Sequence, residues 1–250
     1  MLKTINQNGI ELKMNVETEF ENHRFDSFFV KEPETLAWIK TIMKPEDTFF
    51  DIGANVGVYS LFAKAVHGSQ MRVFSFEPAY HNFEKLCRNI IDNKFSNIMP
   101  YCVAISDKMS LQTIELASNI SGSASHLLSS APKQLFENFT SQFEQGVFTI
   151  SLDGLIEDYG FIFPNHIKID VDGVEELIIK GAKNTLKNKN LKSVLIELTD
   201  EDGAKERIKD MFYNAGFKSD HPVNFHPDSM RERRQRTGKL SSLENVIFTR

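Results

Sequence analysis

Two short segments of the chain carry residues suited to binding a nucleoside. Residues 48–57 run from an apolar, partly β-branched stretch into Asp51, Gly53 and Gly57, and residues 74–78 contain Glu77, 20 positions after Gly57. A glycine-rich turn between a strand and a helix lets a ligand approach the backbone and the helix N-terminal amides. An acid that closes the next strand can accept hydrogen bonds from ribose hydroxyls. Together the two segments predict an adenosine-cofactor site.

The glycine spacing distinguishes between adenosine cofactors. The turn Gly53-Ala54-Asn55-Val56-Gly57 lacks the G-x-G-x-x-G pattern that brings a pyrophosphate onto a helix N-terminus. A cofactor without phosphates is therefore favoured, and S-adenosylmethionine fits because an acid at Asp51 suits its amino group, directly or through water. A glycine-rich turn or a strand-end acid alone occurs in many α/β proteins, so the prediction depends on finding both.

The same motifs resemble the class I S-adenosylmethionine-dependent methyltransferases, in which a D-x-G-x-x-x-G turn is followed by a strand ending in an acid. Further motifs narrow the resemblance to the FkbM family of methyltransferases. These motifs are Phe76-Glu77-Pro78, Val103-Ala104-Ile105-Ser106-Asp107, Ser151-Leu152-Asp153 and the stretch from Ile167 to Glu175. The similarity runs from about Thr48 to Glu197, and Asn245-Val246-Ile247-Phe248 shows a weaker similarity. The sequence departs from the family at Asp172, where the family usually has glutamate. It implies a Rossmann-like class I methyltransferase fold and O-methylation with S-adenosyl-L-methionine, which leaves S-adenosyl-L-homocysteine.

Cofactor contacts are expected from three strand ends and from the turns that follow them. Main-chain groups and the side chain of Ser106 or Asp107 should lie near the adenine, as the equivalent turn does in similar enzymes. The expected cofactor-binding residues are Asp51, Gly53, Ala54, Asn55, Gly57, Glu77, Pro78, Ala104, Ile105, Ser106, Asp107 and Asp170. No C-x-x-C or H-E-x-x-H signature is present in the sequence, so no metal is expected.

Four residues are candidates for the chemistry itself. By the resemblance, Lys168 and Asp170 are site residues: Asp170 would accept or orient the acceptor's hydroxyl proton, and Lys168 would hold that carboxylate or steer an anionic substrate. A buried structural Lys–Asp pair is the alternative. Glu197 ends a strand in the same manner as Asp170 and is expected to face the cleft. His126 is a candidate general base if its loop closes, and a surface histidine is the simpler interpretation.

Alternating strand and helix patterns predict an α/β fold with a mostly parallel central sheet and an antiparallel edge strand. We expect one domain over residues 1–250. Its parts are an N-terminal extension (1–47) with a hairpin turned at Asn8-Gly9, a cofactor-binding half (48–116), an insertion or lid (117–150) and an acceptor-side half (151–250). Strands are expected at 48–52, 98–105, 110–116, 167–171, 193–198, 217–219 and 245–249, and helices at 33–42, 56–66 and 174–187. Trp38 should pack on the sheet.

Two segments interrupt this pattern. Residues 117–130 contain six serines, and Phe136, Phe139 and Phe143 follow at helical spacing. They predict a polar loop and then an amphipathic helix, which either covers the acceptor site or packs on the core. Residues 231–239 carry five basic side chains and one acid. This segment is either a solvated loop or a contact to an anionic acceptor such as a phosphorylated or carboxylated sugar.

Composition is consistent with an enzyme that has a sizeable core. The chain has 250 residues, 41% of them hydrophobic, and a formal net charge of −5, so nucleic acid is not an expected partner. Cys87 and Cys102 are expected to be buried reduced thiols. The sequence contains no signal-peptide core and no membrane-length apolar run, so a cytoplasmic location is the default expectation.

The expected partner is a small-molecule or glycan acceptor; the sequence specifies no oligomeric state. Three other functions share parts of the pattern. A nicotinamide-dependent oxidoreductase would use the same fold class but needs the absent G-x-G-x-x-G. A nucleic-acid methyltransferase often carries N-P-P-Y or D-P-P-Y, and only Met99-Pro100-Tyr101 occurs here. A non-catalytic module would bind the cofactor without turnover.

Overall fold

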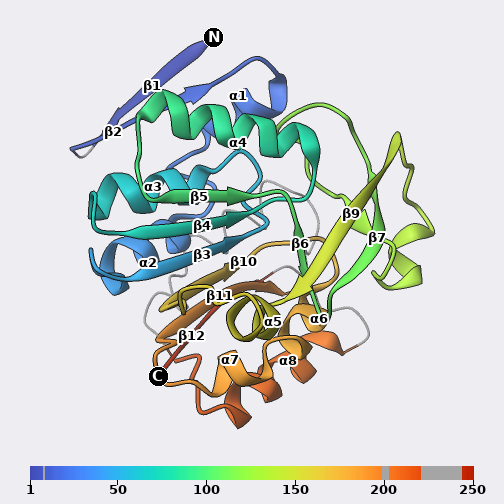
Figure 1. Cartoon of the computed structure of the whole chain (residues 1–250). Helices are drawn as coiled ribbons and strands as arrows, with labels where there is room; N and C mark the ends of the chain where they lie inside the picture. The colour runs from blue at the N-terminus through green and yellow to red at the C-terminus, as the bar shows by residue number, and fades with distance from the viewer. Residues whose placement is uncertain (8, 199–202, 221–243) are drawn as a thin grey trace.

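The computed structural model describes residues 1–7, 9–198, 203–220 and 244–250 (Figure 1). The chain forms a six-stranded sheet, a four-stranded sheet and a two-stranded hairpin, with helices on both faces of the larger sheet. The basic segment 231–239 lies outside the described residues. Within the described residues, no helix is both long enough and apolar enough to cross a membrane.

The six-stranded sheet confirms the predicted α/β architecture. Its strand order is β12 (Glu244–Thr249), β11 (Ser193–Leu198), β10 (His166–Ile169), β3 (Thr48–Ile52), β4 (Arg72–Phe76) and β5 (Ile98–Tyr101). All neighbouring pairs are parallel except β11 with β12, so the sheet has the predicted antiparallel edge strand. The strand expected at 217–219 does not form, and Lys218 makes only a single antiparallel bridge to Thr249. Every residue of β3 is buried, as expected for a central strand covered on both faces.

Side chains from alternate positions of the sheet enter two separate cores. Phe49, Val73 and Leu195 pack into the core that also contains residues of α2 (Pro33–Ile42), α3 (Val58–His67) and α4 (Tyr80–Asn93). Phe50 and Ile167 pack into the other core, beneath α5 (Leu152–Glu157), α6 (Glu175–Lys180), α7 (Lys183–Lys187) and α8 (Ala204–Asn214). This alternation fixes which strand side chains face the first core and which face the second.

The N-terminal extension adds a third layer over the first core. Strands β1 (Leu2–Gln7) and β2 (Ile10–Asn15) form the expected hairpin, in which Leu12 and Met14 are fully buried. Helix α1 (Glu19–Asp26) begins at a capping box made by Thr18 and Glu21. Helix α2 has the predicted bounds, and Trp38 packs on the sheet as predicted, with its Nε1 donating to Ser193 Oγ at 2.9 Å.

The second sheet corrects two predictions. Its order is β6 (Ala104–Ser106), β9 (Phe143–Ser151), β7 (Ser110–Leu116) and β8 (Leu127–Leu128), and it stands at the end of the central sheet toward which β3 to β5 point (Figure 1). The predicted strand 98–105 is therefore two strands in two sheets. The predicted amphipathic helix is wrong, because Phe143 begins β9 and only the short 3-10 helix η1 (Lys133–Phe136) forms before it. Pairing of β9 with β7 over seven residues outweighs the local helical spacing.

Two smaller expectations also differ from the structure. The helix predicted at 174–187 is broken into α6 and α7 near Gly181, where an added Cβ would lie 2.4 Å from the Ser106 carbonyl oxygen. Both cysteines are free, as expected, but neither is buried: Cys87 is partly exposed and Cys102 is exposed. Cys102 lies in the link between β5 and β6, where the chain passes from one sheet to the other.

Candidate active site

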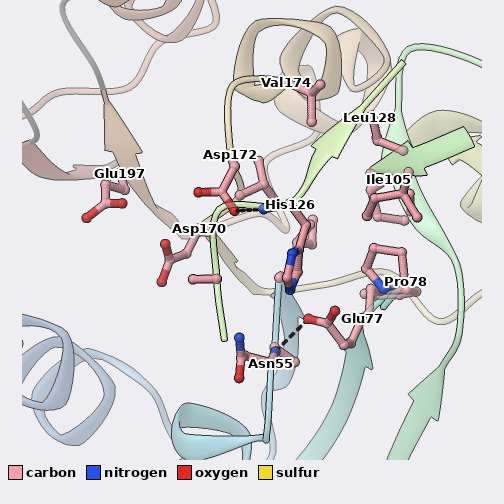
Figure 2. A pocket seen from close by; sticks show the side chains of 18 of the residues that line it. Asn55, Glu77, Pro78, Ile105, His126, Leu128, Asp170, Asp172, Val174 and Glu197 are labelled. Atoms are coloured by element: carbon pink, nitrogen blue, oxygen red, sulfur yellow. Dashed lines mark hydrogen bonds between the residues drawn. The ribbon is translucent and has the colours of Figure 1, made fainter. Parts of the chain in front are cut away.

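A cavity of about 320 Å³ opens at the carboxyl ends of the central strands (Figure 2). This is where open α/β sheets place their ligands. Ten residues expected from the sequence line it: Gly53, Ala54, Asn55, Glu77, Pro78, Ala104, Ile105, His126, Asp170 and Glu197. Five expected residues do not line it: Asp51, Gly57, Ser106, Asp107 and Lys168.

The turn after β3 is packed against the ends of both neighbouring strands. The Gly53 amide donates to the Phe76 carbonyl at the end of β4, at 2.9 Å. Gly53 has φ of +76°, and a Cβ at this position would lie 1.9 Å from the Asp170 carbonyl oxygen. Only glycine therefore allows the turn to sit this close to β10, which places Asp170 beside the backbone of the turn.

Glycine at position 53 can be tested against a matched control. Gly53→Ala is expected to lower the free energy of unfolding by at least about 2 kcal/mol more than Gly216→Ala. Gly216 also has positive φ, at +87°, but an added Cβ there would meet nothing within 4 Å. Urea unfolding followed by circular dichroism measures the difference. Equal losses in the two variants would show that the close approach of Asp170 imposes no constraint at Gly53.

Glu77 is held rigidly at the tip of β4. Its Oε2 accepts from the Asn55 amide at 2.8 Å and its Oε1 accepts from the Ala79 amide at 2.9 Å, while the side chain is only 5% exposed. Burial raises the pKa of this carboxyl to about 7 despite the two backbone hydrogen bonds. An ionised carboxylate has about four lone-pair sites, so two remain for ligand hydroxyls.

If Glu77 holds a ribose, as the sequence predicts, this pKa predicts a pH-dependent affinity for 5′-methylthioadenosine, a nucleoside without a titrating amino acid. Because ionised Glu77 accepts more hydrogen bonds than its protonated form, affinity should rise roughly tenfold from about pH 6 to about pH 8. Arg24 and Asp172 also influence this carboxyl, and burial raises the pKa of Asp172 itself to about 6. Calorimetric titrations across the range should show the rise in the wild type and in Asp172→Asn, and a weak, flat profile in Glu77→Gln. A wild-type profile that is flat would refute the role of ionised Glu77.

Asp51 lies behind the cavity wall. Its side chain is fully buried under α3, where Ser60 Oγ donates to Oδ2 at 2.6 Å. Burial raises the pKa of Asp51, although Lys168 opposes this shift. Lys168 is its partner in the strand register. Asp51 is thus placed to act on the site through Lys168 and the shape of the turn.

Lys168 is the centre of a buried charge network. Its side chain is 1% exposed, and its Nζ lies 2.6 Å from Asp170 Oδ2 and 4.6 Å from the centre of the Tyr59 ring. The Tyr59 hydroxyl in turn donates to Glu32 Oε2 at 2.6 Å. Burial disfavours ionisation of both Lys168 and Asp170, but their mutual attraction dominates. It raises the pKa of Lys168 and holds the pKa of Asp170 well below its usual range. Asp170 is therefore ionised near pH 7 at the cavity wall.

The serine-rich segment is fastened to the cavity. The Asn55 side chain donates to the Ser123 carbonyl at 2.7 Å, and Asn82 accepts from the Gly122 amide at 2.8 Å. The His126 amide donates to Asp172 Oδ2 at 3.1 Å, which places the imidazole inside the cavity in Figure 2. His126 is partly buried in the cavity lining rather than fully exposed.

The electrostatics of His126 keep its imidazole neutral. Burial lowers its pKa to about 4, and neighbouring His81 and Arg24 act in the same direction. Its Nε2 lies 3.3 Å from Ser123 Oγ, and its Nδ1 is buried without a hydrogen-bond partner among the described residues. The ring is therefore neutral near pH 7 and has an unused nitrogen.

Sequence reasoning missed the contribution of the N-terminal extension. Arg24 of α1 and Lys31 line the cavity, as does Tyr59 of α3. Arg24 Nε donates to the Gly122 carbonyl at 2.8 Å. The Thr18-x-x-Glu21 capping box is a readable helix start. The capping box predicts where the helix begins but not that the helix reaches the cavity, because the strands that form the cavity come later in the chain.

The fold and the position of this cavity define the class I methyltransferase architecture. The structure resembles a crystal structure of methyltransferase FkbM from Methylobacillus flagellatus KT, with a TM-score of 0.53 and 13% identity over 92% of this chain and 52% of that one. Residues 51–219 match the family model of the methyltransferase FkbM domain. The chain belongs to this family.

Two curated relatives are similar at low identity. The hexuronic acid methyltransferase AglP of Haloferax volcanii is 27% identical over 61% of this chain and 56% of its own length. The 31-O-demethyl-FK506 methyltransferase FkbM of Streptomyces tacrolimicus is 25% identical over 70% of this chain and 74% of its own length. The chain thus spans little more than half of the first relative.

Proposed function

We propose that the protein is an S-adenosylmethionine-dependent methyltransferase that methylates a hydroxyl of a sugar, natural product or other small molecule. The observation that carries the proposal is the meeting of Glu77, the glycine turn and the neutral imidazole of His126 in one cavity. Membership of the FkbM family supports methyl transfer. The two relatives, named for a hexuronic acid and a macrolide, support an oxygen acceptor.

The lining of the cavity fits this cofactor. Glu77 has the position and the spare lone pairs to hold a ribose diol, and Ile105, Leu128 and Val174 provide an apolar surface for an adenine ring. Asp170, ionised near pH 7, suits the ammonium group of the amino-acid end. The absence of a G-x-G-x-x-G turn agrees with a ligand without pyrophosphate. Bound S-adenosylmethionine would supply an electrophilic methyl group on a sulfonium.

The protein's part in the reaction is alignment and removal of one proton. We infer that His126 accepts the hydroxyl proton, because its neutral imidazole lines the cavity. Asp170 is a weaker candidate for the base, since Lys168 holds it ionised at low basicity. Its role in this scheme is to orient the reactants and balance their charge. Glu197 lines the same cavity and is placed to accept a hydrogen bond from the acceptor.

Methyl transfer can be tested with radiolabelled cofactor. The purified protein is incubated with methyl-tritiated S-adenosylmethionine and panels of uronic-acid glycans, neutral glycans and polyhydroxylated natural products, with RNA as a separate panel. Label in alkali-stable ether linkages of a glycan or natural product is expected. Label in RNA would favour the nucleic-acid alternative, and tight binding of NADH in calorimetry with none of S-adenosylmethionine would favour an oxidoreductase.

His126 provides the matching mutational test. With an acceptor from that panel, His126→Asn is expected to lower kcat by about a hundredfold, because the hydroxyl loses its base. Affinity for S-adenosylhomocysteine should change less than threefold or so. His81→Asn is the control, since its ring lies 5.4 Å from that of His126 and does not line the cavity. An equal loss in both variants would mean that the two rings only support the loop.

A further inference from the structure

Arg24 is a cation of the cavity lining to which no acid is bound among the described residues. Arg24 extends from the last turn of α1 into the cavity and donates one hydrogen bond, to the Gly122 carbonyl. Among the residues that the structure describes, no carboxylate lies within ion-pair distance of its guanidinium. Arginine has five N–H donors, so most of its hydrogen-bonding capacity remains unused at this site.

Three acids, Glu77, Asp170 and Asp172, line the same cavity as Arg24. Its positive charge favours the ionised forms of Glu77, Asp170 and Asp172. None of the three is close enough to pair with it directly. The cavity lining therefore contains anionic side chains and an arginine that is not paired with them. Such an arrangement suits a ligand that carries charges of both signs.

Helix α1 holds Arg24 in a fixed place. The Thr18 hydroxyl at the helix start donates to the Ser121 carbonyl at 2.7 Å, and Arg24 itself is fastened to Gly122. Glu21, fully buried, pairs with Lys85 of α4 at 3.3 Å. The same serine-rich segment is bound to Asn55, whose amide fixes Glu77. The guanidinium and the Glu77 carboxylate are thus positioned by one connected set of contacts.

Lys31 is a second cationic residue of the N-terminal extension. It also lines the cavity, where it is paired with Glu32 at 2.8 Å and remains 40% exposed. We propose that Arg24, together with Lys31 of the same cavity lining, is a carboxylate-binding site that the N-terminal extension contributes to the cavity. The inference rests on the proposed function, which offers two carboxylates: the amino-acid end of the cofactor and a uronate on the acceptor.

The first source, the carboxylate of the cofactor, can be tested with two nucleosides that differ only in whether they carry the amino acid. S-adenosylhomocysteine carries the carboxylate, and 5′-methylthioadenosine has the same nucleoside and thioether without it. If the cofactor is the source, Arg24→Gln should weaken S-adenosylhomocysteine about tenfold to a hundredfold and leave 5′-methylthioadenosine unchanged in calorimetry. Arg24→Lys should recover part of the loss. Arg88→Gln is the control, because it removes an exposed charge from α4 outside the cavity.

Uronate binding tests the second source. If the acceptor is the source, Arg24→Gln should leave both nucleosides unchanged. Ligand-observed NMR with the S-adenosylhomocysteine complex should then show D-glucuronate binding in preference to D-glucose, and the variant should lose the preference. Two results would overturn the inference. In the first, Arg24→Gln changes neither the nucleoside affinities nor the preference for uronate. In the second, Arg24→Gln leaves the nucleoside affinities unchanged and the wild type itself shows no preference for uronate. Absence of binding of either nucleoside to the wild type would instead refute the proposed function.

Discussion

Lys168→Met is expected to lower the free energy of unfolding by about 3 to 5 kcal/mol. The substitution keeps the length of the side chain but removes the charge that offsets Asp170 at 2.6 Å and, more distantly, buried Asp51 and Glu32. Those carboxylates would then have to protonate or remain ionised in a poorly solvated interior. Urea unfolding of the wild type and the variant measures the loss directly.

An exposed lysine serves as the control for this experiment. Lys180 forms an i,i+4 pair with Glu176 and is 49% exposed, so Lys180→Met should change stability by less than about 1 kcal/mol. If Lys168→Met lowered the free energy of unfolding no more than Lys180→Met does, the buried charge network would contribute little to stability.

Glu77→Ala is expected to weaken S-adenosylhomocysteine by about a hundredfold to ten-thousandfold. Two hydrogen bonds to a charged acceptor are lost, each worth about 1.5 to 3 kcal/mol. The Asn55 and Ala79 amides also lose their acceptor, which loosens the turn after β3. Calorimetric titration gives the affinity, and circular dichroism confirms that the variant is folded.

The control for Glu77 is a glutamate of the next helix. Glu84 of α4 is 58% exposed and pairs with Arg88 on the surface, so Glu84→Ala should bind the nucleoside as the wild type does. Unchanged affinity in Glu77→Ala would remove this residue from the cofactor site. Because Glu77 is the best-defined polar group of the cavity, that result would also remove the main support for a nucleoside ligand.

The strand-end residues of the site were predictable because they follow local rules. One apolar run ends at Asp51 and Gly53, and another ends at Glu77. Both runs predict strands, and the carboxyl ends of such strands meet at one edge of a parallel sheet. Asp170 and Glu197 follow from the same rule. Asp51 is an exception to this rule, because the pleat of the strand turns its side chain under α3 rather than into the cavity. A shift of one residue in register would reverse the direction of the side chain.

The remaining parts of the site depend on contacts between distant segments. Arg24 enters the cavity because α1 and its cap are bound to Ser121 and Gly122, about a hundred positions later in the chain. Such a contact has no local periodicity from which it could be read. Likewise, the spacing of Phe136, Phe139 and Phe143 suggested a helix, and pairing of β9 with β7 overrode it. Residues 104 and 105 reach the cavity, but Ser106 and Asp107 do not, because β6 leaves the central sheet to pair with β9.

The most direct test of the account is a crystal structure of the protein with S-adenosylhomocysteine. We expect the nucleoside in the cavity at the carboxyl ends of β3, β4 and β10, with its ribose hydroxyls within hydrogen-bond distance of the Glu77 carboxylate and its adenine against Ile105. A structure in which this cavity stays empty at saturating ligand, or in which the nucleoside binds elsewhere, would contradict the account.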